Sequence, residues 1–286
     1  MKTYFSLLRV KHWIKNLFVF APIIFSKNLF NLELFNKTLI TFFLLSLLTS
    51  GLYILNDIFD LDSDLEHPEK RNRPLPSGKV NKNFALTLSI ILITLPITLS
   101  LFIDHALTII FFIYLILNFL YSFLIKRLVI IDVFIIAINF ILRIFSGSVV
   151  TKITVSNWLI LCTLFLSLFL GFAKRRFEIV LLGENAHKHR EVLSSYSVEL
   201  LDKLIVILST ATILSYSLYS VSTETKEKFG EGFIFTIPIV LYGILRYFYL
   251  IYEKKEGEPI KLVTEDLPLI LTILIWIIFS IFIIYK

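Results

Sequence analysis

The chain has 286 residues, 57% hydrophobic and 17% charged, and its 28 Lys and Arg exceed its 22 Asp and Glu to give a net charge of +6. A mean hydropathy of +0.82 excludes an ordinary soluble domain, and the single cysteine, Cys162, excludes a disulfide framework and a Cys-based metal site. The charges are bunched between long apolar runs. We therefore expect an all-α polytopic membrane protein in a lipid bilayer, with residues 1–286 forming a single domain.

Nine segments are long or apolar enough to span a bilayer. In chain order they are about 16–31, 38–56, 84–103, 106–125, 129–150, 157–173, 201–221, 232–252 and 267–285. The first and sixth are short or interrupted, and Pro22 and Pro96 lie within spans that they are expected to kink. The sequence thus predicts a bundle of about nine transmembrane helices.

Most of the 28 Lys and Arg residues lie in the N-terminal segment and in the loops after even-numbered spans. The positive-inside rule then predicts a cytosolic N-terminus and an outside C-terminus in the inner (plasma) membrane. The positive net charge reflects this topology and an anionic substrate, so it gives no reason to expect nucleic acid as a partner. The sequence leaves the oligomeric state open, including a homo-oligomer.

An acidic motif ends the second predicted span. Asp57, Asp60 and Asp64 are spaced i, i+3, i+7, so on a continuous helix they would share one face, with Asn56 beside it. Carboxylates at this spacing suit Mg²⁺, which takes oxygen ligands and usually shares them with substrate phosphates. A basic run that could bind phosphate follows, with Lys70, Arg71 and Arg73. The motif predicts a diphosphate site, and the alternative is a charged loop that merely ends two membrane helices.

A second polar set lies inside the fifth predicted span. Asp132, Asn139 and Arg143 fall at i, i+7 and i+11, close to one helical face. A charged residue deep in a span usually faces a water-filled cavity or a charged partner, because its insertion costs roughly 2.5–3.5 kcal/mol. We expect the wall of a polar substrate cavity; the alternative for Arg143 is a structural ion pair with Asp132 or another buried acid.

The third region, residues 172–203, holds the longest predicted cytosolic loop. Its candidate substrate-binding residues are Lys174, Arg176, Glu178, Arg190 and Tyr196. Consecutive helical residues diverge by about 100°, so the run 174–176 cannot point one way, whereas positions 174 and 178 share a face. For Arg175 a simple role as a membrane-side anchor is the preferred interpretation.

The acidic motif resembles the first aspartate-rich motif of the UbiA superfamily of intramembrane prenyltransferases, N-D-x-x-D-x-x-x-D, met here by Asn56, Asp57, Asp60 and Asp64. This resemblance implies a UbiA-like helical bundle with Mg²⁺ as cofactor. Tyr121 and Lys126 match the family's Y-x-x-x-x-K element, whose lysine faces the diphosphate.

One departure narrows the resemblance. Where ordinary relatives carry a second aspartate-rich motif, residues 174–178 read Lys-Arg-Arg-Phe-Glu. The opening LRVKHWIKNLFVFAP, with Lys15 and Asn16, and the stretch HPEKRNRPLPSG are similar to the decaprenyl-phosphate phosphoribosyltransferase branch. That branch implies transfer of 5-phosphoribosyl from phosphoribosyl pyrophosphate to a polyprenyl phosphate, with release of pyrophosphate.

Two other functions stay open at the level of sequence. One is an ordinary UbiA-type enzyme that moves a prenyl chain from its diphosphate to an aromatic acceptor. That function predicts an acidic motif at positions 174–178, where the chain has the basic run Lys-Arg-Arg. The other is a non-catalytic lipid-phosphate binder or transporter, which needs no aspartates spaced for Mg²⁺ at one end of a helix.

Overall fold

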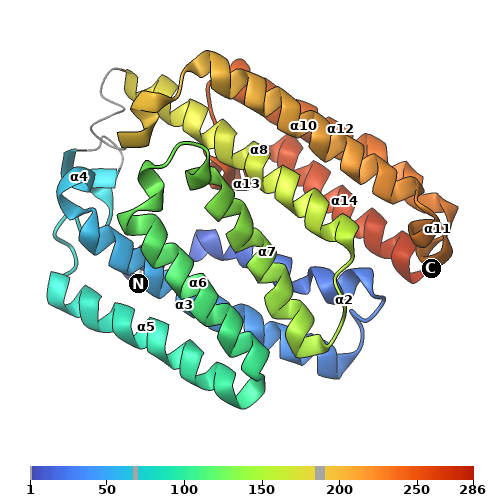
Figure 1. Cartoon of the computed structure of the whole chain (residues 1–286), viewed down its shortest axis with the longest axis horizontal. Helices are drawn as coiled ribbons and strands as arrows, with labels where there is room; N and C mark the ends of the chain where they lie inside the picture. Colours follow the sequence, from blue (N-terminus) through green and yellow to red (C-terminus); the bar gives the residue numbers. More distant parts are fainter. Residues whose placement is uncertain (1, 67–69, 184–190) are drawn as a thin grey trace. The chain divides into compact units, whose positions relative to one another are not determined.

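The computed structural model describes residues 2–66, 70–183 and 191–286, and the described residues form helices and their connections, with no strand among them (Figure 1). Two compact units are distinguished. Unit 1 is built mainly from Met1–Leu128 and Leu142–Thr154, and unit 2 mainly from Val129–Ile141, Val155–His187 and Val192–Lys286. Helix α7 (Ile131–Thr151) contributes to both units. Whether they fold as the single predicted domain stays a prediction.

Unit 1 contains three long helices in addition to the second half of α7. Its elements are α1 (Lys2–Leu7), the 3₁₀ helix η1 (Val10–Phe20), α2 (Ala21–Phe25), α3 (Leu32–Phe59), α4 (Leu61–Glu66), η2 (Lys70–Asn72), α5 (Lys82–Ile103), α6 (His105–Phe123) and η3 (Ile125–Arg127). Helix α3 packs along α5, α5 packs on α6, and η1 lies against α3. Leu45, Leu48, Leu107 and Phe111 are buried in the resulting core.

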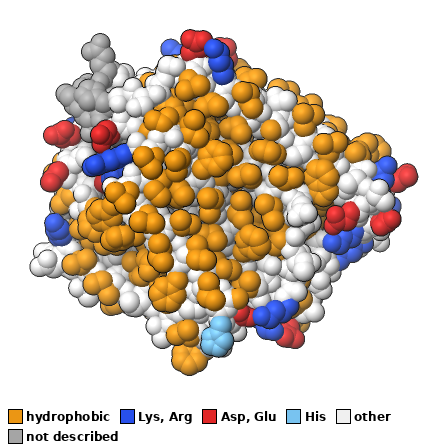
Figure 2. Space-filling model, viewed as in Figure 1, with side chains coloured by type: hydrophobic (Ala, Val, Ile, Leu, Met, Phe, Trp, Pro, Cys, Tyr) orange, Lys and Arg blue, Asp and Glu red, His pale blue; other side chains and the backbone are white. Residues whose placement is uncertain are grey.

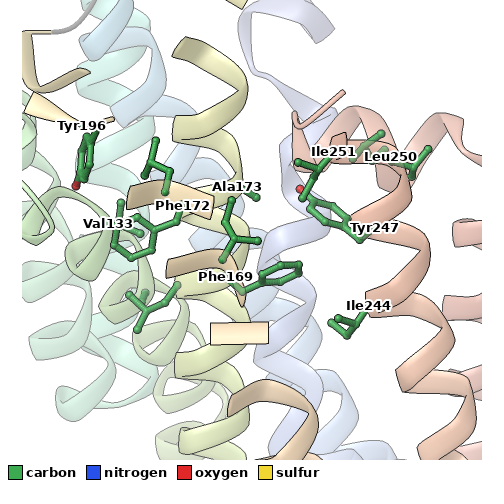
Figure 3. Packing of buried hydrophobic residues seen from close by; sticks show 14 of the residues in the cluster. Val133, Phe169, Phe172, Ala173, Tyr196, Ile244, Tyr247, Leu250 and Ile251 are labelled. Carbon is green, nitrogen blue, oxygen red and sulfur yellow. The ribbon is translucent and has the colours of Figure 1, made fainter. Parts of the chain in front are cut away.

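Unit 2 is a second helical core around α8. Besides the first half of α7 it has α8 (Asn157–Leu182), η5 (Glu191–Ser195), α10 (Val198–Val221), α11 (Thr223–Phe229), η6 (Glu231–Thr236), α12 (Ile237–Tyr252), α13 (Pro259–Glu265) and α14 (Leu267–Tyr285). Phe169 of α8 meets Tyr247 of α12 edge-on at 5.4 Å between ring centroids (Figure 3). Phe172 packs near Tyr196, which follows η5.

Short polar residues set where the long helices begin. At each of six starts a side-chain oxygen accepts a hydrogen bond from a backbone N–H in the first turn, which satisfies a donor that the helix itself leaves unpaired. The capping residues are Asn31, Asn81, Asp104, Ser156, Ser197 and Asp266. The sequence shows a start signal at these positions, because each short polar residue stands within three residues of the first apolar side chain of its helix.

Eight of the described helices are long and apolar enough to cross a membrane, so the chain is an integral membrane protein. Hydrophobic side chains cover much of the face seen in Figure 2, and most charged groups lie at its margins. The first of the nine predicted spans, residues 16–31, is not among these eight helices and is not confirmed. That segment is divided between η1 and the short α2, where Pro22 occupies the first turn. The orientation of the termini, which depended on nine spans, stays a prediction.

Unit 1 contains one backbone contact that only glycine permits. A Cβ atom placed on Gly147 of α7 would lie 1.9 Å from the carbonyl oxygen of Val19 in η1. The missing side chain therefore lets the two helices touch through their backbones.

We expect Gly147→Ala to destabilise the protein by roughly 1–3 kcal/mol or more, because a new methyl group would push two backbones apart. Thermal unfolding in detergent measures this. Gly243→Ala on α12 is the matched control, since its Cβ would lie 3.5 Å from the nearest side-chain atom and Ala favours a helix by about 0.5–1 kcal/mol. An unchanged melting temperature for Gly147→Ala would contradict the close approach.

Candidate functional site

The acidic motif lies where α3 gives way to α4. Helix α3 ends at Phe59, and Asp60 caps it before α4 begins at Leu61. Backbone N–H groups of Asp60 and Asp64 still bond four residues back, at 2.9 and 2.8 Å. The continuous helix assumed from the spacing is therefore interrupted at one residue, and this residue is one of the three aspartates.

Two of the three carboxylates converge on one cationic nitrogen. Arg73 Nη1 donates to Asp57 Oδ1 at 2.9 Å and to Asp64 Oδ2 at 2.7 Å. Both aspartates are buried, at 3% and 2% exposure, and Lys70 Nζ lies 3.6 Å from the other oxygen of Asp64. Burial, and then the nearby charge of Arg9, lower the pKa of Arg73, while both carboxylates act in the opposite direction.

A further arginine contacts this pair although it was not among the predicted site residues. Arg9 donates to Asp57 Oδ1 and lies over the ring of Tyr53, 4.9 Å from its centroid. Its backbone is left-handed, at φ 50° and ψ 47°, which L-residues adopt at some cost in energy. The sequence signal for Arg9 was its place in the opening stretch LRVKHWIKNLFVFAP, but nothing in the spacing placed it beside the aspartates.

Asp60 faces different partners. Lys126 Nζ donates to Asp60 Oδ1 at 2.8 Å, and Asn56 Nδ2 donates to Oδ2 at 2.9 Å. Ser122 of α6 in turn donates to Asn56 Oδ1 at 3.0 Å. The residues around the acidic motif thus form one ionic cluster in which four cations, Arg9, Lys70, Arg73 and Lys126, contact three carboxylates.

The donor set fits a magnesium ion that is held partly by substrate. In the described part of the chain no three His, Cys, Asp or Glu side chains gather as a metal site. The two oxygens around Arg73 Nη1 nevertheless converge on one positive charge. Mg²⁺ commonly takes one or two carboxylates, at about 2.1 Å, and completes its shell with water and substrate phosphate. Asp57 and Asp64 could hold the ion in this way once Arg73 withdraws.

Arg143 lies in a buried polar cluster of unit 1. Its Nε donates to Asn16 Oδ1 at 2.9 Å, and its Nη2 donates to Tyr114 Oη at 2.7 Å. Asn16 donates onward to hydroxyls of α3. The alternative ion pair with Asp132 is excluded as a direct contact, because 11 residues along α7 correspond to about 16 Å.

The remaining predicted residues of the N-terminal half are placed less tightly. Lys15 on η1 and Tyr121 on α6 are half-buried, Arg71 on η2 is exposed, and Asn139 on α7 is buried. Arg190 lies outside the described residues. Within unit 1, no contact described above joins Lys15, Arg71 or Tyr121 to the ionic cluster.

In unit 2 the buried acid Asp132 is bonded from two sides. Arg175 Nε donates to its Oδ2 at 2.7 Å, and Tyr196 Oη donates to its Oδ1 at 2.8 Å. The backbone N–H of Ile130, a β-branched residue with φ 70°, donates to Tyr196 Oη at 2.5 Å. Burial is the main cause that raises the pKa of Tyr196, so the hydroxyl stays protonated and can donate.

The three consecutive cations of α8 pair with different acids, because helical geometry turns their side chains in different directions. Lys174 pairs with Glu258 at 2.7 Å and Arg176 with Asp202 at 2.5 Å. Arg175, expected to be an anchor, is the most buried of them, at 1% exposure, and it also donates to Glu178 at 2.9 Å. The i, i+4 spacing predicts that Glu178 orients Lys174 or binds a ribose hydroxyl, whereas the ion pair described here joins Glu178 to Arg175.

Comparison with known proteins identifies the family of the chain. The model of the family described as the UbiA prenyltransferase family matches residues 18–264. The chain belongs to this UbiA family. This confirms that the chain is a member of the predicted family and that it is a transferase.

Two relatives are similar along almost the whole chain. The decaprenyl-phosphate phosphoribosyltransferase of Mycobacterium tuberculosis is 28% identical over 94% of this chain and 90% of its own length. The protein of the same name from Corynebacterium glutamicum is 30% identical over 94% and 83%. A solved UbiA homolog from Archaeoglobus fulgidus, bound to DMAPP and Mg²⁺, is 18% identical with a TM-score of 0.72 and covers 99% of both chains, which shows the fold.

If the donor is the phosphoribosyl pyrophosphate that the sequence resemblance implies, we expect Lys174→Ala and Arg176→Ala to weaken its binding roughly 10- to 100-fold, the value of a charge-assisted hydrogen bond, while affinity for the lipid acceptor stays unchanged. The apparent affinity for phosphoribosyl pyrophosphate at fixed acceptor measures this. Lys203→Ala, which removes an exposed cation paired with Glu199, is the control for loss of charge alone. Because Arg176 also stacks on Tyr252, a thermal melt must accompany its variant. Normal donor affinity with defective membrane insertion would mean that these residues are only anchors.

Proposed function

We propose that the chain transfers a 5-phosphoribosyl group from phosphoribosyl pyrophosphate to a polyprenyl phosphate and releases pyrophosphate. The observation that carries this proposal is the similarity, along 94% of the chain, to relatives named decaprenyl-phosphate phosphoribosyltransferase. The basic run at positions 174–176 supports it. Phosphoribosyl pyrophosphate carries a phosphate on ribose C5 in addition to its diphosphate, and this extra phosphate needs cations that a prenyl diphosphate does not need.

In this proposal the ionic cluster of unit 1 receives the donor's diphosphate. Asp57 and Asp64 would hold Mg²⁺, and the ion would supply positive charge beside the leaving pyrophosphate. Asp60 keeps Lys126 in position, and the cations of the cluster donate hydrogen bonds to phosphate oxygens. The proposed contacts to the donor include Asn56, Lys70, Arg71, Arg73, Tyr121 and Lys126.

The reaction breaks the bond between ribose C1 and the diphosphate oxygen, and it forms a bond between C1 and an oxygen of the lipid phosphate. Because the acceptor is already an anion at neutral pH, it needs no strong general base. The protein's main tasks are to stabilise the leaving group and to bring two anions together. A surplus of cations over carboxylates in the cluster suits both tasks.

We also assign substrate binding to residues outside the cluster. Arg143 offers a planar guanidinium suited to phosphate or carboxylate. The other residues assigned to substrate are Lys15, Asn16, Asp132, Asn139, Lys174, Arg176, Glu178, Arg190 and Tyr196. The isoprenoid tail is proposed to lie against apolar helices open to the bilayer. The protein is proposed to lie in the inner (plasma) membrane, with its site facing the cytosol.

A two-donor assay tests the function. Purified protein with Mg²⁺ is incubated with labelled phosphoribosyl pyrophosphate and polyprenyl phosphate, and in parallel with labelled prenyl diphosphate and 4-hydroxybenzoate. We expect label to enter the lipid fraction only from phosphoribosyl pyrophosphate, and only with Mg²⁺. Product formed solely from prenyl diphosphate would establish the ordinary prenyl transfer of the family instead. Binding of a labelled substrate without any product would point to a binder or transporter.

A further inference from the structure

Two arginines of the described chain each bridge a pair of carboxylates. The first is Arg73 in the ionic cluster of unit 1. The second is Arg175 in unit 2, whose Nε and Nη1 donate to Asp132 at 2.7 Å and to Glu178 at 2.9 Å. In both places one guanidinium satisfies two acids, which is also the charge arrangement that a divalent cation could provide.

The two bridges differ in their freedom to open. The side chain of Arg73 is 28% exposed and belongs to the connection between η2 and α5. That of Arg175 is 1% exposed and projects from the interior of α8. Withdrawing Arg175 would leave Asp132, which is fully buried, without its guanidinium partner, and an uncompensated buried charge is strongly destabilising. Asp57 and Asp64 are buried too, but they keep Arg9 and Lys70 as partners when Arg73 withdraws. Arg73 can therefore exchange with another cation, whereas Arg175 is fixed.

Asp132 is also closed from its other side. Its Oδ1 accepts from Tyr196, while its Oδ2 accepts from Arg175. Tyr196 is itself held by the backbone N–H of Ile130. A metal ion approaching this acid would have to displace two protein donors that the fold fixes in place.

We propose that Arg175 is a built-in cation that takes the place of a divalent metal between Asp132 and Glu178. This carboxylate pair then binds no metal in the native protein, and any Mg²⁺ is held in unit 1 alone. Only the Mg²⁺ ion in unit 1 rests on the proposed function, because the contacts of Arg175 are independent of it. The positive charge between Asp132 and Glu178 then comes from the guanidinium of Arg175 and not from a dissolved metal ion.

Metal counting on the full-length protein in nanodiscs tests this. Mn²⁺ is added stepwise, and the free ion is followed by its electron paramagnetic resonance signal. We expect Asp132→Asn and Glu178→Gln to bind as many Mn²⁺ ions per chain as the native protein. Loss of one ion in either variant would overturn the proposal, because it would place a metal at these carboxylates.

Removing the guanidinium gives the converse test. We expect Arg175→Ser to bind one more Mn²⁺ than the native protein, and the extra ion to disappear in Arg175→Ser/Asp132→Asn. Arg175→Lys keeps a cation and should gain none. A folded Arg175→Ser protein with the native count would refute the assignment. If that variant does not fold, the counts for Asp132→Asn and Glu178→Gln still decide the question.

Failure of the proposed function is recognised separately. If Asp57→Asn leaves the native Mn²⁺ count unchanged, the unit 1 metal site is wrong, but the gain in Arg175→Ser still reports on Arg175. A result in the two-donor assay that favours prenyl diphosphate would overturn the phosphoribosyl donor without altering any metal count.

Discussion

Asp57→Asn and Asp64→Asn should each lower the rate of transfer by at least about 10²–10³-fold, the loss typical when a preorganised stabiliser of transition-state charge is removed. Each variant deletes one of the two carboxylate charges that converge on the nitrogen of Arg73. Asn is preferred to Ala because both aspartates are buried and ion-paired, so truncation would also disturb the fold. Steady-state rates at several Mg²⁺ concentrations measure the effect.

Asp62→Asn is the matched control for these variants. Asp62 is an exposed acid of α4, between the residues that hold the cluster, and the same loss of charge there should leave the rate within twofold. Removal of divalent ions with a chelator should stop the native enzyme, and added Mg²⁺ should restore it. An Asp64→Asn protein that is folded and fully active would remove this residue from the metal site.

Arg143→Lys should cost most of the activity, roughly 10- to 100-fold, which corresponds to a charge-assisted hydrogen bond. The guanidinium donates through two different nitrogens to Asn16 and Tyr114. An ammonium keeps the charge but cannot reproduce the planar fork. The measurement is kcat and KM for both substrates, together with a thermal melt.

Arg127→Lys supplies the comparison, because Arg127 is 63% exposed in its ion pair with Glu191, and the exchange there should be silent. A near-normal rate in Arg143→Lys would assign Arg143 a structural role. A fall in rate with an unchanged melting temperature supports a role toward substrate.

Much of the fold could be predicted from the pattern of apolar runs. Runs of about 20 residues, each preceded by a capping side chain such as Asn81 or Ser197, predict long helices at the right places. The segment 16–31 shows where this reasoning ends. Its composition is apolar, but η1 and α2 divide it. Hydropathy does not distinguish a spanning helix from two short helices, of which η1 packs against α3.

The candidate site shows a similar division. Spacing correctly brought Asp57 and Asp64 together, since seven residues correspond to nearly two helical turns. It could not show that Asp60 would cap α3 and turn to Lys126, because a cap depends on where the helix ends. Periodicity separated Arg175 from its neighbours in direction but could not say which direction was buried, because burial is decided by the helices that pack around α8.

The left-handed backbone of Ile130 has a consequence for laboratory evolution. A β-branched side chain is poorly suited to this conformation, so Gly or Asn at position 130 would relieve the cost that the native residue carries. A screen for thermostability alone would favour such replacements. The backbone N–H group of Ile130 donates to the hydroxyl of Tyr196 and orients it toward Asp132. A more flexible residue at position 130 would hold this hydroxyl less firmly. Selection for heat resistance and selection for turnover would then diverge at this position.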